Sequence, residues 1–220
     1  MDNGVVYPFS NFPKEEMEKS MKTKLILASG SPRRREILRD AGIDFQILSV
    51  DTDESCAIPE PTAYAEALAL KKGQAAWAKI KQELKEGIDR TDAVILTADT
   101  VVATEREILG KPKDRADAIR MIRALSGDTH LVITGIGLTV GGVTTTTHCV
   151  TEVNVSCIPE EEIVKYVDSG DPMDKAGGYG IQGSFSRWIR GIRGCYFNVV
   201  GLPVHTLNHL FYDCTGEYLG

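Results

Sequence analysis

The sequence lacks an apolar run long enough to cross a bilayer. Its first twenty residues also lack the apolar centre of a secretion signal, because they contain Pro8, Pro13 and the charged stretch 14–19. We therefore expect no contact with membranes. We also expect a flexible N-terminal extension over residues 1–22, followed by a single domain over residues 23–220.

Cysteine is scarce, and the five cysteines are an odd number without any CxxC spacing. This pattern argues against a disulfide framework or a structural zinc site, and it indicates free thiols in a reducing compartment. We therefore expect a cytoplasmic protein. His205 and His209 are spaced four residues apart, but no fourth zinc ligand is evident. Nothing further in the sequence supports Cys195 and His205 as a nucleophilic pair.

An excess of positive charge is also missing, since the net charge is −6 and the pI is about 5.3. This balance argues against a protein that coats polymeric nucleic acid through bulk electrostatics. A local cluster of arginines can still bind a nucleotide inside an acidic protein. Hydrophobic residues make up 42% of the chain, which is enough for an ordinary globular core.

Alternating strand and helix patterns predict a mixed α/β fold. The apolar run 25–28 predicts a buried strand, and the helix that follows begins at Pro32 and ends at Gly42. The other expected elements are a strand at 45–50, a helix at 62–84, a strand at 93–102, a helix capped by Asp114, a hairpin of strands 131–140 and 143–156, a helix at 160–167, a Gly-rich loop at 169–183, one or two strands within 185–201 and a helix at 204–212. This order predicts a mixed twisted sheet flanked by helices.

A candidate phosphate-binding segment, 29–35, joins the first predicted strand to the first predicted helix. A helix N-terminus presents free N–H groups and a partial positive charge to an anion. Ser29 and Ser31 add hydroxyl donors, and Arg33 and Arg34 add forked cationic donors. The segment is not a Walker A loop. From these residues alone, a Ser-capped helix with a solvated basic face is an equally good interpretation.

Carboxylates lie at or just after the ends of two predicted strands. Asp99 lies near the end of strand 93–102, where open α/β sheets bind ligands, although a strand-end Asp that caps a turn is the simpler interpretation. Asp51, Asp53 and Glu54 follow the preceding strand and could hold a hard cation such as Mg²⁺. An ordinary acidic loop is the commoner explanation for that cluster.

Three lysines are further candidates, although each alone is more often solvated surface. Lys71 and Lys72 lie on the predicted helix 62–84, and Lys111 lies in a tight turn that would orient its side chain.

The Gly-rich segment 174–183 formally matches GxGxxG through Gly178, Gly180 and Gly183. A dinucleotide-binding interpretation fails, because no strand precedes these glycines and no helix follows them. The glycines more plausibly let the backbone approach a ligand closely, with Gln182 able to donate and accept hydrogen bonds.

Together these motifs resemble the Maf family, over about Lys24 to His209. The matching motifs, in family order, are Leu27 to Arg34, Ala98 to Val102, Leu109 to Pro112, Leu125 to Gly127, Asp174 to Gln182 and Val199 to Pro203. The resemblance implies an α/β fold with two lobes around a central cleft, similar to inosine triphosphate pyrophosphatases. It also implies a homodimer that hydrolyses a nucleoside triphosphate to the monophosphate and pyrophosphate with Mg²⁺ or another divalent cation such as Mn²⁺.

The resemblance also assigns roles to single residues. Asp99 matches the proton-accepting aspartate of the family, and Glu54, Lys72 and Lys111 match other active-site positions. We expect Glu54 and Asp99 to hold the metal. The basic residues, Arg34 among them, would neutralise the phosphates.

The expected substrate follows from three further positions. Arg33, Thr100 and Gln182 look like the branch that acts on dTTP and UTP, and modified pyrimidine nucleotides are also possible substrates. The branch that acts on 7-methyl-GTP typically has Gln after the Asp and Glu in place of Gln182. The segment 184–190 departs from the family, since Phe185 is bulky where the family typically has Gly, so we expect an altered backbone near Gln182.

Two alternatives remain open at this point. One is a nucleotide-binding regulator of cell division that does not hydrolyse its ligand. The other is an enzyme of the same fold that acts on 7-methyl-GTP. A test for pyrophosphate release separates the first alternative from the enzyme, and a substrate panel separates the second.

Overall fold

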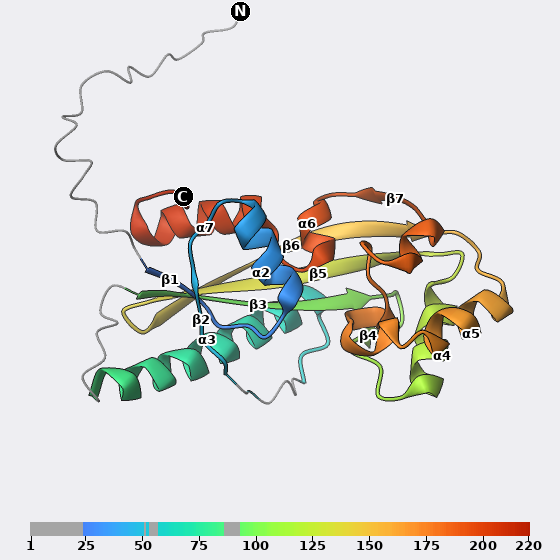
Figure 1. Cartoon of the computed structure of the whole chain (residues 1–220), viewed down its shortest axis with the longest axis horizontal. Helices are drawn as coiled ribbons and strands as arrows, with labels where there is room; N and C mark the ends of the chain where they lie inside the picture. Colours follow the sequence, from blue (N-terminus) through green and yellow to red (C-terminus); the bar gives the residue numbers. More distant parts are fainter. Residues whose placement is uncertain (1–23, 51, 53–56, 86–92) are drawn as a thin grey trace, which may run out of the picture.

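A mixed sheet runs through the length of the molecule (Figure 1). The computed structural model describes residues 24–50, 52, 57–85 and 93–220. The expected extension at 1–22 and the candidate carboxylates Asp51, Asp53 and Glu54 lie outside the described residues. No helix in the described part of the chain is long and apolar enough to span a bilayer.

Within the described residues the sheet has seven strands in the order β2-β1-β3-β5-β6-β7, with β4 beside β3. Pairing is parallel for β1 with β2 and β3, and antiparallel for the other pairs. This arrangement confirms the predicted mixed sheet. The strands are β1 (Lys24–Leu27), β2 (Gln46–Ile47), β3 (Ala93–Ala103), β4 (Ile108–Leu109), β5 (Thr129–Val140), β6 (Val143–Val155) and β7 (Ile189–Arg193).

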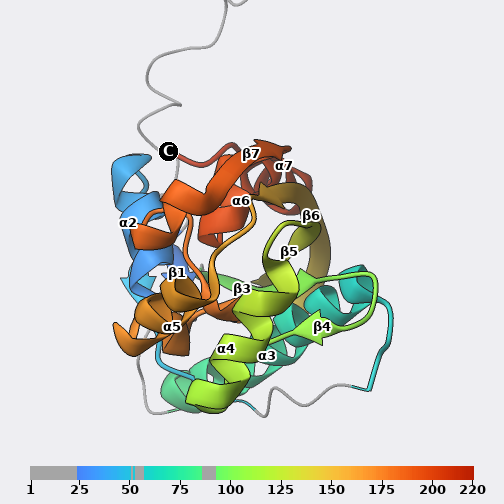
Figure 2. The same ribbon diagram turned by 90° about the vertical axis from the view of Figure 1, so that its right-hand side faces the viewer.

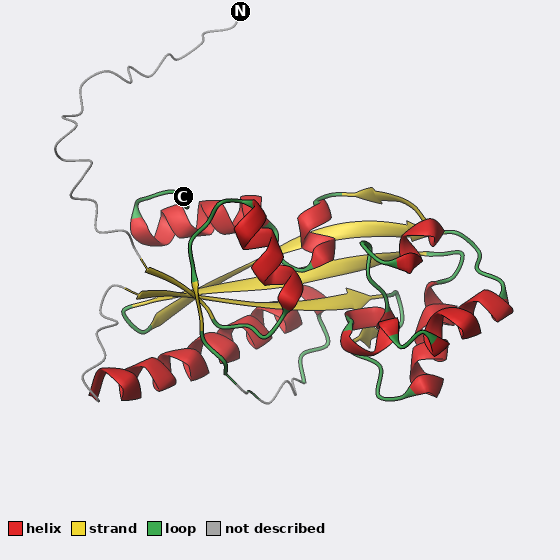
Figure 3. Cartoon of the chain, viewed as in Figure 1, coloured by secondary structure: helices red, strands yellow, loops and turns green. Residues whose placement is uncertain are grey.

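Helices cover both faces of this sheet (Figures 2 and 3). One apolar cluster packs α2 and α7 on one face, and a second joins α4 and α5 at one end of the molecule. The long helix α3 lies on the opposite face from α2 and α7. The helices are α2 (Pro32–Asp40), α3 (Pro61–Lys85), α4 (Arg115–Leu125), α5 (Glu160–Asp168), α6 (Tyr196–Val200) and α7 (Val204–Thr215), with 3-10 turns η1 (Asp171–Asp174), η2 (Ala176–Gly178) and η3 (Ser184–Trp188).

Most of the predicted elements are confirmed. Asp114 caps α4, because its Oδ1 accepts a hydrogen bond of 2.8 Å from the Asp117 N–H. The predicted hairpin joins β5 to β6, with Val140 opposite Val143 and positive φ at both glycines of the turn. Glycine accommodates such a turn without steric cost.

Two predictions were wrong in extent or type. The strand expected at 45–50 is only Gln46–Ile47, and the region 185–201 forms η3, β7 and α6 instead of one or two strands. Within the described part of the chain β7 pairs with β6 alone, so it is an edge strand of this sheet. Apolar residues in a stretch as short as Tyr196–Val200 do not distinguish a strand from a helix by periodicity.

Glycines of β5 allow α3 to lie directly on the sheet. A Cβ at Gly135 would lie 2.3 Å from the Ala65 carbonyl oxygen of α3, which no real contact permits. Nearby, the Thr97 hydroxyl donates a hydrogen bond of 2.8 Å to the Ala69 carbonyl. Ala65, Ala69 and Lys72 lie on one face of α3 at helical spacing. The close approach therefore brings Lys72 over β3, where Asp99 lies.

We expect Gly135→Ala to lower the free energy of unfolding by about 1–3 kcal/mol or more, because the added methyl must displace the backbone of α3. Urea denaturation would measure this loss. Gly191→Ala is the matched control, since a Cβ there meets nothing within 4 Å. Equal midpoints for the two variants would show that the close approach does not constrain the fold.

Candidate active site

A cavity of about 490 Å³ opens between the two lobes of the molecule. One wall is the β1–α2 connection, the floor is β3, and the opposite wall is the segment from η1 to Gly183. Nine of the described candidate residues line this cavity, whereas the candidate Lys71 does not. The nine are Ser29, Ser31, Arg33, Arg34, Lys72, Asp99, Thr100, Lys111 and Gln182.

Asp99 forms an ion pair with Lys72 on the cavity floor. The Lys72 ammonium donates to Oδ1 of Asp99, and both side chains are largely buried, at 16% and 13% exposure. Among the described residues, no hydrogen bond reaches Oδ2 of Asp99. The ion pair therefore holds an ionised carboxylate in one orientation, with its second oxygen available to a ligand or water.

Arg34 is buried at 9% exposure and ties three segments together. Its guanidinium donates to the Gly201 carbonyl at 2.8 Å, the Ser29 hydroxyl at 3.0 Å and the Thr100 hydroxyl at 3.1 Å. These bonds fix the plane of the guanidinium beside the phosphate-binding segment. The sequence singled out Arg34, Ser29 and Thr100, but it gave no signal for the Gly201 contact.

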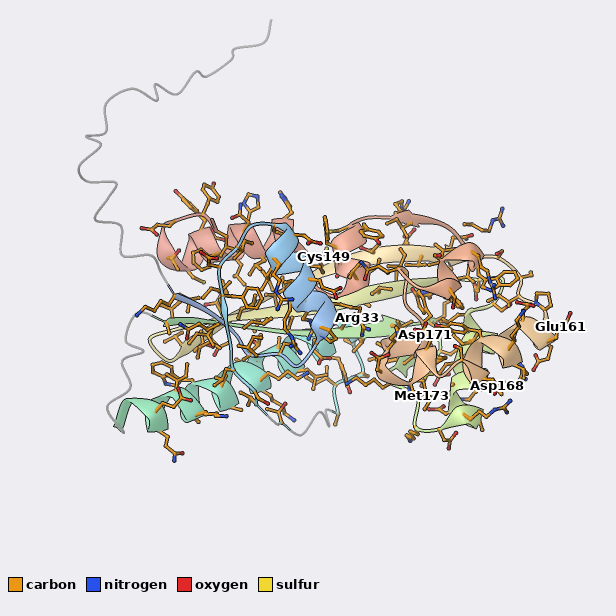
Figure 4. All side chains as sticks on the ribbon, in the orientation of Figure 1. Arg33, Cys149, Glu161, Asp168, Asp171 and Met173 are labelled. Atoms are coloured by element: carbon orange, nitrogen blue, oxygen red, sulfur yellow. The ribbon has the colours of Figure 1, made fainter. Side chains whose placement is uncertain are left out.

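A second ion cluster links the two cavity walls, and Figure 4 labels two of its members, Arg33 and Asp171. Arg33 of α2 lies 3.1 Å from Asp174 of η1, and Lys175 bonds to both Asp174 and Asp171. The Lys175 ammonium donates three hydrogen bonds, to the Asp171 backbone carbonyl, Asp171 Oδ1 and Asp174 Oδ1. These bonds hold the η1 side of the cavity wall together. Burial raises the pKa of Asp174, but the bonds from Lys175 and Arg33 outweigh it and hold that pKa below its usual range.

Lys111 and Gln182 lie on exposed turns at the cavity edge. Phe185 points away from the cavity, because its side chain is fully buried between Tyr166 and Tyr179, at ring distances of 5.2 and 4.7 Å. The bulky residue that we expected to disturb the backbone near Gln182 is therefore a core residue, and Gln182 still lines the cavity.

The described residues supply only some of the ligands that a divalent cation needs. No group of three or more Asp, Glu, His or Cys side chains gathers among them. Mg²⁺ usually binds one or two carboxylates and completes its shell with water and phosphate oxygens. Asp99 and Asp174 both line the cavity, and Asp174 is already paired with Arg33 and Lys175. The carboxylate of Asp99 therefore suits such a site, whereas Glu54 lies outside the described residues.

A buried histidine that the sequence did not reveal supports the wall. His130 Nε2 lies 2.6 Å from the Tyr179 hydroxyl, and Tyr179 lines the cavity. Burial lowers the pKa of His130 to about 4 and raises the pKa of Tyr179. Both groups are therefore neutral at neutral pH.

Comparison with known proteins agrees with this geometry. The family model described as Maf-like protein matches residues 24–214. The chain belongs to the Maf family. The resemblance seen in the motifs is thereby confirmed.

Relatives of this Maf chain carry the name dTTP/UTP pyrophosphatase. One from Koribacter versatilis is 47% identical over 82% of this chain and 89% of its own length. Another from Agathobacter rectalis is 44% identical over 84% of this chain and 94% of its length. A third from Vibrio cholerae is 41% identical over 86% of this chain and 97% of its length. These matches span nearly the whole domain that contains the cavity.

We expect His130 to make this Maf chain less stable in acid. The unfolded chain binds a proton near pH 6.5, whereas the folded chain binds it near 4, so unfolding takes up a proton between these values. Stability should therefore fall by about 2–3 kcal/mol as pH drops from about 7.5 to 4.5. Urea denaturation of His130→Gln should lack this part of the decline, while the exposed control His205→Gln should keep it. Parallel pH profiles for wild type and His130→Gln would contradict the assignment.

Proposed function

We propose that this Maf protein is a nucleoside triphosphate pyrophosphatase that hydrolyses the bond between the α and β phosphates of dTTP and UTP. The observation that carries the proposal is the Lys72–Asp99 ion pair on the floor of a nucleotide-sized cavity, with Arg33 and Lys111 at its edges. The names of the relatives point to the same activity and the same substrates. The products are the monophosphate and pyrophosphate.

The chemistry follows from charge. Anionic oxygens surround the α-phosphorus and repel an attacking hydroxide, so cations must neutralise them. Arg33, Lys72 and Lys111 come from separate segments and supply positive charge around the cavity. Asp99 orients an attacking water and accepts its proton. Lys72 keeps that carboxylate in position until the substrate arrives.

We also propose that a divalent cation, Mg²⁺ or Mn²⁺, is required and that Asp99 and Glu54 hold it. When bound, the cation neutralises charge on the phosphates and on the leaving pyrophosphate. The oxygen of Asp99 that Lys72 does not occupy is the ligand available within the described residues. We further propose that the protein is cytoplasmic and forms a homodimer. Light scattering after size-exclusion chromatography would measure the mass of the assembly and so test the homodimer.

Gln182 supports the choice of a pyrimidine. A uracil or thymine edge presents two carbonyl oxygens and one N–H, and a glutamine amide can both donate to and accept from such an edge. A glutamate at this position would only accept, which suits a base that presents N–H donors, such as guanine. Gln182 lines the cavity from the wall opposite Ser29 and Ser31, so base and phosphates can be held at the same time.

One assay separates this proposal from its alternatives. Pyrophosphate release is measured with Mg²⁺ on a panel of dTTP, UTP, modified pyrimidine triphosphates, GTP and 7-methyl-GTP. We expect the pyrimidine nucleotides to have the highest kcat/KM. Nucleotide binding without release would support a regulator of cell division that does not hydrolyse, and a preference for 7-methyl-GTP would support the other branch of the family.

We expect Asp99→Asn to reduce kcat by about two to four orders of magnitude while the protein stays folded. The substitution preserves the shape of the side chain and removes its basicity and charge. Thermal denaturation would check the fold, and steady-state rates at saturating Mg²⁺ would check the loss. Turnover near the wild-type rate would refute the role of Asp99 as base.

We expect Gln182→Glu to lower kcat/KM for UTP more than for 7-methyl-GTP, by about tenfold to a hundredfold. The new carboxylate cannot donate to a pyrimidine carbonyl. Both substrates are measured on wild type and variant, with Gln74→Glu as a control on the exposed side of α3. An unchanged ratio between the two substrates would mean that Gln182 only braces the wall.

A further inference from the structure

Asn198 is a fully buried polar residue that the motifs did not single out, and its side chain makes three hydrogen bonds. Its amide nitrogen donates to the Val132 carbonyl and the Thr151 hydroxyl, both at 2.9 Å. Its amide oxygen accepts from the Thr134 backbone N–H at 3.1 Å. The side chain therefore binds the short helix α6 to both β5 and β6.

A line of hydroxyl groups continues from Asn198 to the cavity. The Thr134 hydroxyl donates to the backbone carbonyl of Asn198 at 3.0 Å, which uses the only proton of that hydroxyl. In the 2.9 Å contact between Thr134 and Thr100, the Thr100 hydroxyl must then be the donor. Thr100 in turn accepts from the Arg34 guanidinium. The proton positions are thus set in one direction, from Arg34 through two threonines to Asn198.

A second connection runs through the backbone. α6 ends at Val200, and the carbonyl of the next residue, Gly201, accepts the 2.8 Å bond from Arg34 Nε. A helix of five residues has too few internal bonds to be stable by itself. Its position, and with it the Gly201 carbonyl, depends on the bonds that Asn198 makes to the sheet.

We infer that Asn198 is a positioning residue of the active site, which sets the orientation of Arg34 through Thr134 and Thr100 and through Gly201. Arg34 lies beside Ser29 at the phosphate-binding segment, so its orientation controls how the nucleotide phosphates are held. This inference rests on the proposed function. A merely structural Asn198 would stabilise the fold without any specific link to Arg34.

A double-mutant cycle tests this link. Asn198→Ala removes the anchor, and Thr134→Val removes only the central hydroxyl while keeping the shape of the side chain. Each is made alone and together with Arg34→Lys. Asn208→Ala is the matched control, because Asn208 bonds to Leu219 at the C-terminus and does not line the cavity. Thermal denaturation establishes that each variant is folded.

We expect each anchor variant to lower kcat/KM for UTP by about tenfold in the wild-type background, the size of one lost buried hydrogen bond. In the Arg34→Lys background the same substitutions should change kcat/KM by less than about twofold, because the contact they act through is already altered. Asn208→Ala should leave kcat/KM unchanged relative to each parent background.

Equal losses in both backgrounds would overturn the inference and leave Asn198 a structural residue, while the pyrophosphatase function stands. If the wild type binds UTP without releasing pyrophosphate, the proposed function fails, and the same cycle is then judged on the Kd for UTP. Coupling in Kd between Asn198 and Arg34 supports the positioning role, and additive effects overturn it.

Discussion

The site depends on one buried guanidinium. Arg34 is 9% exposed, and three of its hydrogen bonds reach Ser29, Thr100 and Gly201, which belong to distant parts of the sequence. A buried charge is tolerated only where its donors are satisfied, so removal of any one acceptor destabilises the whole arrangement. The first strand–helix connection, the central strand and α6 are therefore held at fixed distances from one another. The cavity wall formed by the β1–α2 connection is rigid for this reason.

Positive charge is concentrated in the cavity of a protein whose net charge is −6. The lysines and arginines there have different tasks, and the hydrogen bonds separate them. Lys175 donates three hydrogen bonds to Asp171 and Asp174, so its role is to stabilise the cavity wall. Lys72 orients the carboxylate of Asp99, and Arg33 forms a single ion pair with Asp174 at the edge of the cavity. An incoming triphosphate competes with carboxylates for these cations, so phosphate binding and the spacing of the two walls are coupled.

Sequence patterns predicted the parts of the site that short motifs carry, but not the contacts that support them. Lys72 could be placed with Asp99 only through the resemblance, since the glycine in β5 that permits their approach has no local signature. Asn198 was missed because its stretch reads equally well as a strand, and a buried polar residue is recognised only when its partners are known. Thr134 looks like any β-branched residue of a strand. Such residues are defined by tertiary contacts, which single-sequence periodicity does not contain.

The Gly-rich segment 174–183 connects the turn that carries Lys111 to the segment that carries Gln182. Gly177 has a φ of 66°, and a Cβ there would lie 2.8 Å from Val102, so only glycine lets this backbone rest on β3. The N–H of Gly177 donates a hydrogen bond of 2.9 Å to the carbonyl of Gly110, the residue before Lys111. The turn that carries Lys111 and the segment that leads to Gln182 are therefore one connected unit. A displacement of this unit moves Lys111 and Gln182 together, so under the proposed function the recognition of the base and of the phosphates is coupled.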